Sequence, residues 1–253
     1  MILGISGKKH SGKNTVANVI HGLALKQMNM IQDWSVGDKG HLNVLTQDGW
    51  GVFDVTRRDA QFRQWAEPNL YPYVKMYSFA DALKWLAVDL FDVPEECCFG
   101  TEEQKNQKHE HLCWENLPIL VRHIEWGHPN AFGPMTAREF LQVFGTDICR
   151  GIWEPIWVNK CIKDIKREGT LLAIIPDVRF PNEVQAIEEA GGMVLRLTRH
   201  VFDDDHNSET ALDDYSFNQY LDNKNDSIDS TIAKVQRFYR SFLLRNFDDS
   251  NIH

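Results

Sequence analysis

The amino-acid sequence contains no stretch of about 20 uninterrupted apolar residues, the length that a membrane-spanning helix requires. It also shows no charged and then apolar leader ahead of its first motif. We therefore expect a protein that starts at Met1, works in the cytoplasm and makes no membrane contact.

The chain has few cysteines and fewer basic than acidic residues. The five cysteines are an odd number without a Cys-x-x-Cys pair, which favours reduced, mostly buried thiols over a metal site or a disulfide framework. The net charge of -9 argues against sequence-independent binding of duplex nucleic acid, although a local basic cleft could still hold a small anion. With 253 residues, of which 43% are hydrophobic and 25% charged, the chain fits one soluble enzyme domain.

The most informative motif lies near the start of the chain. A short apolar run over residues 2–5 precedes the spacing Gly-x-x-x-x-Gly-Lys, formed by Gly7, Gly12 and Lys13. This spacing is typical of a phosphate-binding loop, because glycines let backbone N–H groups curl around a polyphosphate that the lysine then reaches. A helix expected over about 12–27 directs its positive end at the same anion. An ordinary glycine turn is the alternative, and the strand-like run before the loop disfavours it.

One position of this loop departs from the usual pattern. The residue after Lys13 is commonly Ser or Thr, whose hydroxyl holds magnesium, whereas this chain has Asn14. Thr15 then supplies the remaining hydroxyl, directly or through water. The candidate nucleotide-binding residues are Gly7, Lys8, His10, Ser11, Gly12, Lys13, Asn14 and Thr15.

Strand-like and helix-like segments alternate along the rest of the chain, which predicts a parallel sheet covered by helices on both faces. The spacing of apolar residues predicts strands at 74–79, 171–176, 193–198 and 217–221, and helices at 80–91, 134–150, 152–167, 182–190 and 227–244. Residues 30–73 and 92–133 interrupt the alternation, and we interpret them as insertions in a single domain. The histidines of the second insertion and the acidic run 203–206 are interpreted as solvated segments, with a metal site as the alternative.

A second group of candidates follows the apolar run 171–176. Asp177 stands where a strand of such a fold places the carboxylate that orients magnesium or its waters. Arg179 could extend its planar guanidinium from the same edge toward a phosphate. Glu183, on the first turn of the next helix, is an arginine partner or a substrate contact; a local ion pair and a helix-start charge are the structural alternatives.

A third group lies on the helix expected over 134–150. Arg138 and Gln142 are four residues apart and share a face, and Gly145 and Thr146 follow one turn later. This face could hold a substrate phosphate through Arg138 and a base through Gln142. Trp157 could stack on a base, although packing is the more common role of such a residue.

Together these blocks resemble phage-type deoxynucleoside monophosphate kinases, which have a P-loop NTPase fold. The resemblance rests on residues 11–15, 78–84, 138–146 and 177–183, with further matches at 206–209 and 225–226, and the Asp-Val-Arg-Phe-Pro-Asn-Glu block at 177–183 is its most specific part. Members of this family typically have Asp at the position of Asn14. The two insertions lie outside the resemblance.

The resemblance implies a three-layer α/β/α sandwich and transfer of the γ-phosphoryl group of ATP to a deoxynucleoside monophosphate. It implies ATP and Mg²⁺ as cofactors, with Lys13 at the β- and γ-phosphates, and with Asp177 and Thr15 at the metal. Arg138, Gln142 and Arg179 would hold the acceptor. Arg199, or its rival Arg196, would serve the transition state from a lid at about 200–215.

Two other functions are consistent with the sequence: a P-loop kinase for another small acceptor, and a nucleotide-binding regulatory or assembly protein. A homodimer is the default assembly for a protein of this size, and its location would be the host cytoplasm if the chain is phage-encoded.

Overall fold

The computed structural model describes residues 1–57, 59–117, 132–199 and 210–248, which group into two compact units. The first unit combines residues 1–78 with everything from residue 162 onward, and the second spans residues 79–161. The helix α8 begins in the second unit and ends in the first. Our description of the chain as a single domain stays a prediction.

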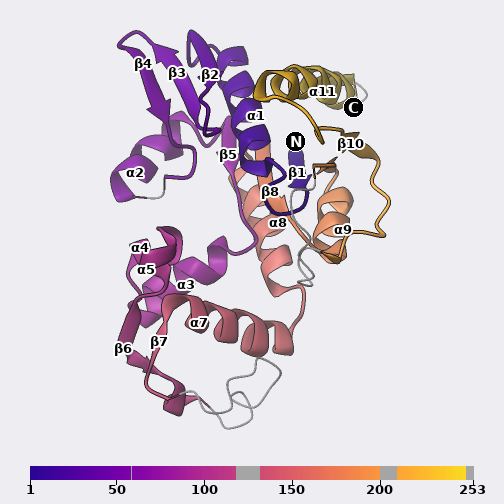
Figure 1. Ribbon diagram of the computed structural model, residues 1–253. Helices are drawn as coiled ribbons and strands as arrows, with labels where there is room; N and C mark the ends of the chain where they lie inside the picture. The colour runs from indigo at the N-terminus through magenta and orange to yellow at the C-terminus, as the bar shows by residue number, and fades with distance from the viewer. Residues whose placement is uncertain (58, 118–131, 200–209, 249–253) are drawn as a thin grey trace. The chain divides into compact units, whose positions relative to one another are not determined.

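A five-stranded parallel sheet forms the centre of the first unit, with the strand order β10-β9-β1-β8-β5 (Figure 1). Its strands are β1 (Ile2–Ser6), β5 (Val74–Met76), β8 (Leu172–Val178), β9 (Met193–Leu197) and β10 (Gln219–Leu221). Each strand lies within or close to a segment predicted from apolar runs. The α/β class and the parallel central sheet are therefore confirmed.

Helices flank this sheet because alternate side chains of its strands point to opposite faces. Besides α2, which is described below, the described helices of the first unit are α1 (Lys13–Gln27), α9 (Pro181–Glu189), α11 (Ile228–Asp248) and the end of α8 (Ile156–Glu168). Leu3 and Ile5 of β1 pack with Val16 and Ile20 of α1 in the main apolar core. Gly4, between those two strand residues, lies instead against Ile187 of α9. The sheet is thus covered by α1 on one face and by α9 on the other.

The expected first insertion has a regular structure of its own. Antiparallel strands β2 (Asp33–Val36), β3 (Leu42–Thr46) and β4 (Gly49–Phe53) form a small sheet that is followed by α2 (Ala60–Asn69). Periodicity did not predict these strands because they are only four or five residues long, which is too short for a clear period. The weakly periodic segment expected over 30–73 is therefore corrected to a sheet and a helix.

The second unit is built from short elements around its own apolar cluster, which includes Ala87, Cys98, Trp114 and Phe140. Its elements are α3 (Asp81–Phe91), α4 (Glu95–Phe99), α5 (Glu102–Lys105), β6 (Lys108–Cys113), the 3₁₀ helix η1 (Trp114–Asn116), β7 (Pro134–Thr136), α7 (Ala137–Gln142), the π-helix η2 (Val143–Arg150) and the start of α8. Part of the expected second insertion, residues 118–131, lies outside the described residues.

One expected helix, over 134–150, is divided into three elements. Residues 134–136 pair with β6 as the strand β7, and Thr136 then caps α7 through a reciprocal capping box with Glu139. From Val143 the helix widens into π geometry. A capping threonine fixes extended backbone at its own position, so the helix begins three residues later than predicted.

Three further features bear on the sequence-based expectations. All five cysteines are free, and Cys97, Cys98 and Cys161 are buried. Within the described part of the chain, no helix is long and apolar enough to cross a membrane. Residues 200–209 of the expected lid lie outside the described residues, while 210–215 follow as a short turn.

Candidate active site

The phosphate-binding loop connects the end of β1 to the start of α1. Gly12 has a φ of 96°, a left-handed conformation that a residue with a side chain rarely adopts. Gly7 is required for a different reason, because a Cβ there would lie 2.4 Å from the Ser11 hydroxyl. The two glycines of the motif therefore permit a compact loop whose N–H groups and helix terminus can surround an anion.

The Lys13 side chain curls back over this loop. Its Nζ donates to the carbonyl oxygens of Gly7, at 2.7 Å, and Lys8, at 3.0 Å, and lies 3.6 Å from Asp177 Oδ1. A cavity of about 420 Å³ opens beside it, lined by residues 9–15 together with Asp177 and Arg179. The structure thus brings the loop and the end of β8 together, as the sequence predicts for parallel strands that end at one edge.

The end of β8 is fixed by hydrogen bonds along the motif. Arg179 Nε donates to Asp177 Oδ2 at 2.7 Å. Glu183 is 4% exposed, and its Oε2 accepts from the backbone N–H of Arg179 at 2.7 Å and of Phe180 at 3.1 Å. Glu183 therefore caps the start of α9 and fixes the Arg179 backbone, and its role as a substrate contact stays a prediction.

The donor set of this pocket fits magnesium and phosphate. Asp177 Oδ1 and Ser11 Oγ are buried and have no hydrogen-bond partner among the described residues. A carboxylate oxygen and the Thr15 hydroxyl, which lines the same pocket, are the hard oxygen ligands that magnesium prefers. Elsewhere in the described structure, no group of three or more His, Cys, Asp or Glu residues could hold a metal by itself.

A buried asparagine that is not part of any of the motifs above connects the loop to Arg199. Asn223 is 1% exposed; its Nδ2 donates to Ser11 O at 2.8 Å, and its Oδ1 accepts from Arg199 N at 2.9 Å. Arg199 itself donates through Nε to Asn223 O and through Nη2 to Asp226 O, at 3.2 and 2.6 Å. The only feature of the sequence that could have indicated Asn223 is its position shortly after the strand predicted at 217–221.

The rival arginine is held on the other side of β9. Arg196 Nη1 donates to Ser6 Oγ at 2.9 Å, and the guanidinium lies 5.4 Å from the centre of the Phe217 ring. Asp213 pairs with Arg196 at 3.5 Å and with Lys8 of the phosphate-binding loop at 2.6 Å. Both arginines thus belong to the first unit and are bonded to segments that adjoin the loop.

The third group of candidates lies in the second unit, and its members differ in exposure. Arg138, Gln142 and Thr146 are exposed, and Arg138 forms an ion pair with Glu102. The pKa of Glu102 is lowered because Lys105 donates to it and Arg138 adds a second positive charge. The structure therefore leaves an exposed basic and amide face on α7 and η2.

Trp157 is placed as a packing residue of this unit. It is 6% exposed, and its indole Nε1 donates at 3.0 Å to the carbonyl oxygen of Gly145, which is also buried. The two residues are thus brought together by a hydrogen bond between α8 and η2. A stacking role for Trp157 is not tested by this contact and stays a prediction.

Comparison with known proteins gives consistent matches. A family model described as deoxynucleotide monophosphate kinase matches residues 77–235. A protein of Acanthamoeba polyphaga mimivirus described as a deoxynucleotide monophosphate kinase is 32% identical over 149 residues, covering 53% of this chain and 67% of that protein. The deoxynucleoside-5'-monophosphate kinase of Escherichia phage T5 is 28% identical over 114 residues, covering 41% of this chain and 46% of the phage enzyme.

Proposed function

The chain belongs to the deoxynucleotide monophosphate kinase family, and on that premise we propose that it transfers the γ-phosphoryl group of ATP to a deoxynucleoside monophosphate, giving ADP and the diphosphate. The observation that carries the proposal is the pocket in which the phosphate-binding loop, Asp177 and Arg179 meet. It offers a lysine, a helix N-terminus, a carboxylate and a guanidinium to two anionic substrates.

The residues of the loop bind the donor phosphates. Lys13 now satisfies its ammonium group with two loop carbonyl oxygens, and a bound triphosphate offers stronger, negatively charged acceptors in the same place. We therefore assign to Lys13 an exchange of these loop contacts for the β- and γ-phosphates. Gly7 through Thr15 supply the surrounding backbone donors, with Asn14 beside them.

Magnesium would be held by Asp177 and by Thr15, directly or through water, together with the phosphate oxygens. When bound, it neutralises negative charge on the transferred group. The ion pair of Asp177 with Arg179 orients one oxygen and leaves the other toward Lys13.

The acceptor needs positioning more than activation. A phosphate oxygen is already a nucleophile, so no strong general base is required, and catalysis consists of aligning two anions and stabilising the developing charge. Arg138 and Arg179 would bind the acceptor phosphate, and Gln142 its base, with Gly145, Thr146, Trp157 and Glu183 as further contacts. Arg199 would stabilise the transition state.

A coupled assay of ADP release tests the proposal directly. Magnesium and ATP are supplied with each of the four deoxynucleoside monophosphates, or with the matching ribonucleotides, in separate reactions. We expect turnover that requires a deoxy acceptor. ATP binding without acceptor-dependent turnover would contradict the proposal and favour a different acceptor or a regulatory role.

A further inference from the structure

The small sheet β2-β3-β4 and the helix α2 lie outside the residues matched by the family model, which begins at residue 77. This insertion is not loosely attached. Leu42 and Val44 of β3 and Phe62 of α2 are buried in the main core together with residues of α1. The insertion is therefore packed against α1, the helix that starts at the phosphate-binding loop.

A turn of the insertion reaches the first turns of α1. Asn18 Nδ2 donates to the carbonyl oxygen of Gly40 at 2.8 Å. Gly40 is buried with a φ of 82°, and a Cβ at this position would lie 2.4 Å from Thr15 Oγ1. The turn thus requires glycine in order to touch the threonine that we assign to the magnesium site.

A cavity of about 370 Å³ opens beside this turn. Asn14 and Thr15 line one part of it, and the exposed side chains of Lys39 and His41 line it as well. Phosphate is the natural ligand of a lysine next to a helix N-terminus, because both carry positive charge. The carboxylate of Asp54 also lines the cavity and accepts from the backbone and hydroxyl of Thr56 at 2.8 and 2.6 Å.

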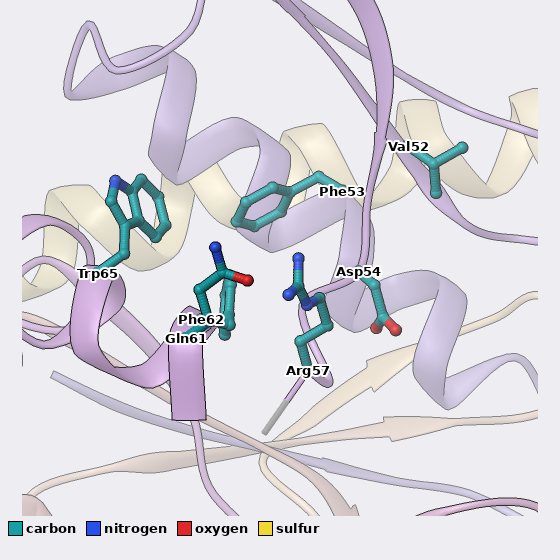
Figure 2. Close-up of a pocket in the computed structure, with 7 residues that line it drawn as sticks. All are labelled: Val52, Phe53, Asp54, Arg57, Gln61, Phe62 and Trp65. Carbon is teal, nitrogen blue, oxygen red and sulfur yellow. The ribbon is translucent and has the colours of Figure 1, made fainter. Parts of the chain in front are cut away.

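A second cavity, of about 450 Å³, adjoins the first, because Val52, Phe53 and Asp54 line both. Three aromatic rings form its apolar part: Phe53 and Phe62 at 6.2 Å between ring centres, and Phe62 and Trp65 at 5.8 Å. Figure 2 shows the rings of Phe53 and Trp65 on either side of a space toward which the Gln61 amide points, with Arg57 on the side of Phe53 away from Trp65.

The polar groups of the second cavity are held in place. The Arg57 guanidinium lies 5.1 Å from the centre of the Phe62 ring, and Asp59 accepts from its Nε and Nη2 at 2.7 and 3.0 Å. Trp65 remains 47% exposed, so one part of its ring is accessible to a ligand. Aromatic faces with an amide and a guanidinium at their edge are the groups that proteins use to stack and hydrogen-bond a nucleobase.

The first cavity therefore has a cationic part, and the adjoining second cavity has an aromatic part. We propose that the insertion binds a nucleotide, with its phosphate near Lys39 and His41 and its base among Phe53, Phe62 and Trp65. This goes beyond the proposed function, since the contacts assigned above to donor and acceptor use none of these five residues. If the bound nucleotide is the acceptor, this site replaces the Arg138 and Gln142 contacts proposed above. If it is not the acceptor, it is an effector that is not phosphorylated.

Binding of each deoxynucleoside monophosphate to the full chain, measured by equilibrium dialysis, tests the proposal. Trp65→Ala should weaken one binding event roughly 5- to 150-fold, because stacking of a base on an aromatic ring contributes roughly 1 to 3 kcal/mol. Lys39→Ala should weaken the same event several-fold. Trp50→Ala, on the same small sheet, and Lys166→Ala, on α8, remove equally exposed side chains outside both cavities and should leave binding unchanged.

The KM for the acceptor distinguishes a bound acceptor from a bound effector. A rise in acceptor KM by the same factor identifies the acceptor, whereas an unchanged KM with one lost binding event identifies an effector. If Trp65→Ala lowers the melting temperature, Gln61→Ala, which changes an exposed side chain, serves as the second variant. Binding that is unchanged in Trp65→Ala, Gln61→Ala and Lys39→Ala overturns the proposal.

The proposed kinase activity can fail or succeed separately. Turnover with normal binding in these three variants refutes the insertion site and leaves the kinase. A Trp65-dependent binding event in a chain without acceptor-dependent turnover refutes the kinase and leaves the insertion site.

Discussion

The loop edge of the parallel sheet and the exposed face of α7 and η2 differ in how their polar groups are held. At the loop edge, Lys13 bonds to its own loop, Asn223 donates to Ser11, and Glu183 accepts from the Arg179 backbone. On the helical face, Gln142 and Thr146 are exposed, and Arg138 forms an ion pair with an exposed carboxylate.

We propose that this difference corresponds to two tasks of a phosphoryl-transfer enzyme. A site that stabilises a transition state benefits from groups fixed before the reaction, because they need no reorganisation when charge develops. A face that binds and releases an acceptor can leave its groups in solvent until the ligand arrives. We therefore expect substitutions at the loop edge to lower kcat and substitutions on the helical face to raise KM.

The largest expected effect is that of Lys13→Ala. Removing the ammonium group takes away a charge that stabilises the transferred phosphoryl, so turnover should fall roughly 100- to 1,000-fold. The melting temperature should change far less than turnover. The matched control is Lys26→Ala in the last turn of the same helix, where the lysine pairs with Asp33 at the surface. Wild-type turnover in Lys13→Ala would refute its assigned role.

The second effect concerns Arg138. Arg138→Ala should raise the acceptor KM roughly 10- to 100-fold, since a charged hydrogen bond contributes about 1.5 to 3 kcal/mol, while kcat changes less. Glu102→Gln is the control, because it breaks the same ion pair and keeps the guanidinium. An equal rise of the acceptor KM in both variants would show that Arg138 acts through Glu102 and not through the acceptor.

The third prediction concerns the buried histidine of the helix that starts at the phosphate-binding loop. His21 of α1 is fully buried, neither ring nitrogen has a partner among the described residues, and burial lowers its pKa to about 3. Between about pH 6.5 and 3 only the unfolded chain binds the proton, so wild-type stability should fall by about 1.4 kcal/mol per pH unit as the pH decreases through this range. His21→Met should remove this dependence and gain about 2 kcal/mol over wild type at pH 5. Parallel pH profiles of the unfolding free energy would contradict the burial of a neutral imidazole.

The smallest expected effect is that of Trp157→Phe. The substitution keeps an aromatic ring and removes the indole donor to Gly145, which should cost about 1 kcal/mol of stability. Denaturant unfolding measures this loss, and acceptor KM measured on the same variant separates packing from stacking. A KM increase above tenfold at unchanged stability would assign Trp157 to the base.

Much of the fold was predictable because its information is local. Apolar runs indicated the strands of the parallel sheet, and the glycine spacing indicated the loop before α1. The strands of the insertion were not predicted, because strands of four or five residues are too short to give a clear period. The division of 134–150 depended on one capping threonine and on a π-helix, neither of which periodicity reports.

The sequence by itself determined the phosphate-binding loop, the parallel sheet and the placement of Asp177 and Arg179 after a buried strand, because each follows from residues that are neighbours in the chain. Only the tertiary structure decided that Asn223 joins Ser11 to Arg199, and that the Gly40 turn of the insertion accepts a hydrogen bond from Asn18 of α1. These contacts join residues whose proximity depends on packing, on which the spacing of residue types carries no information.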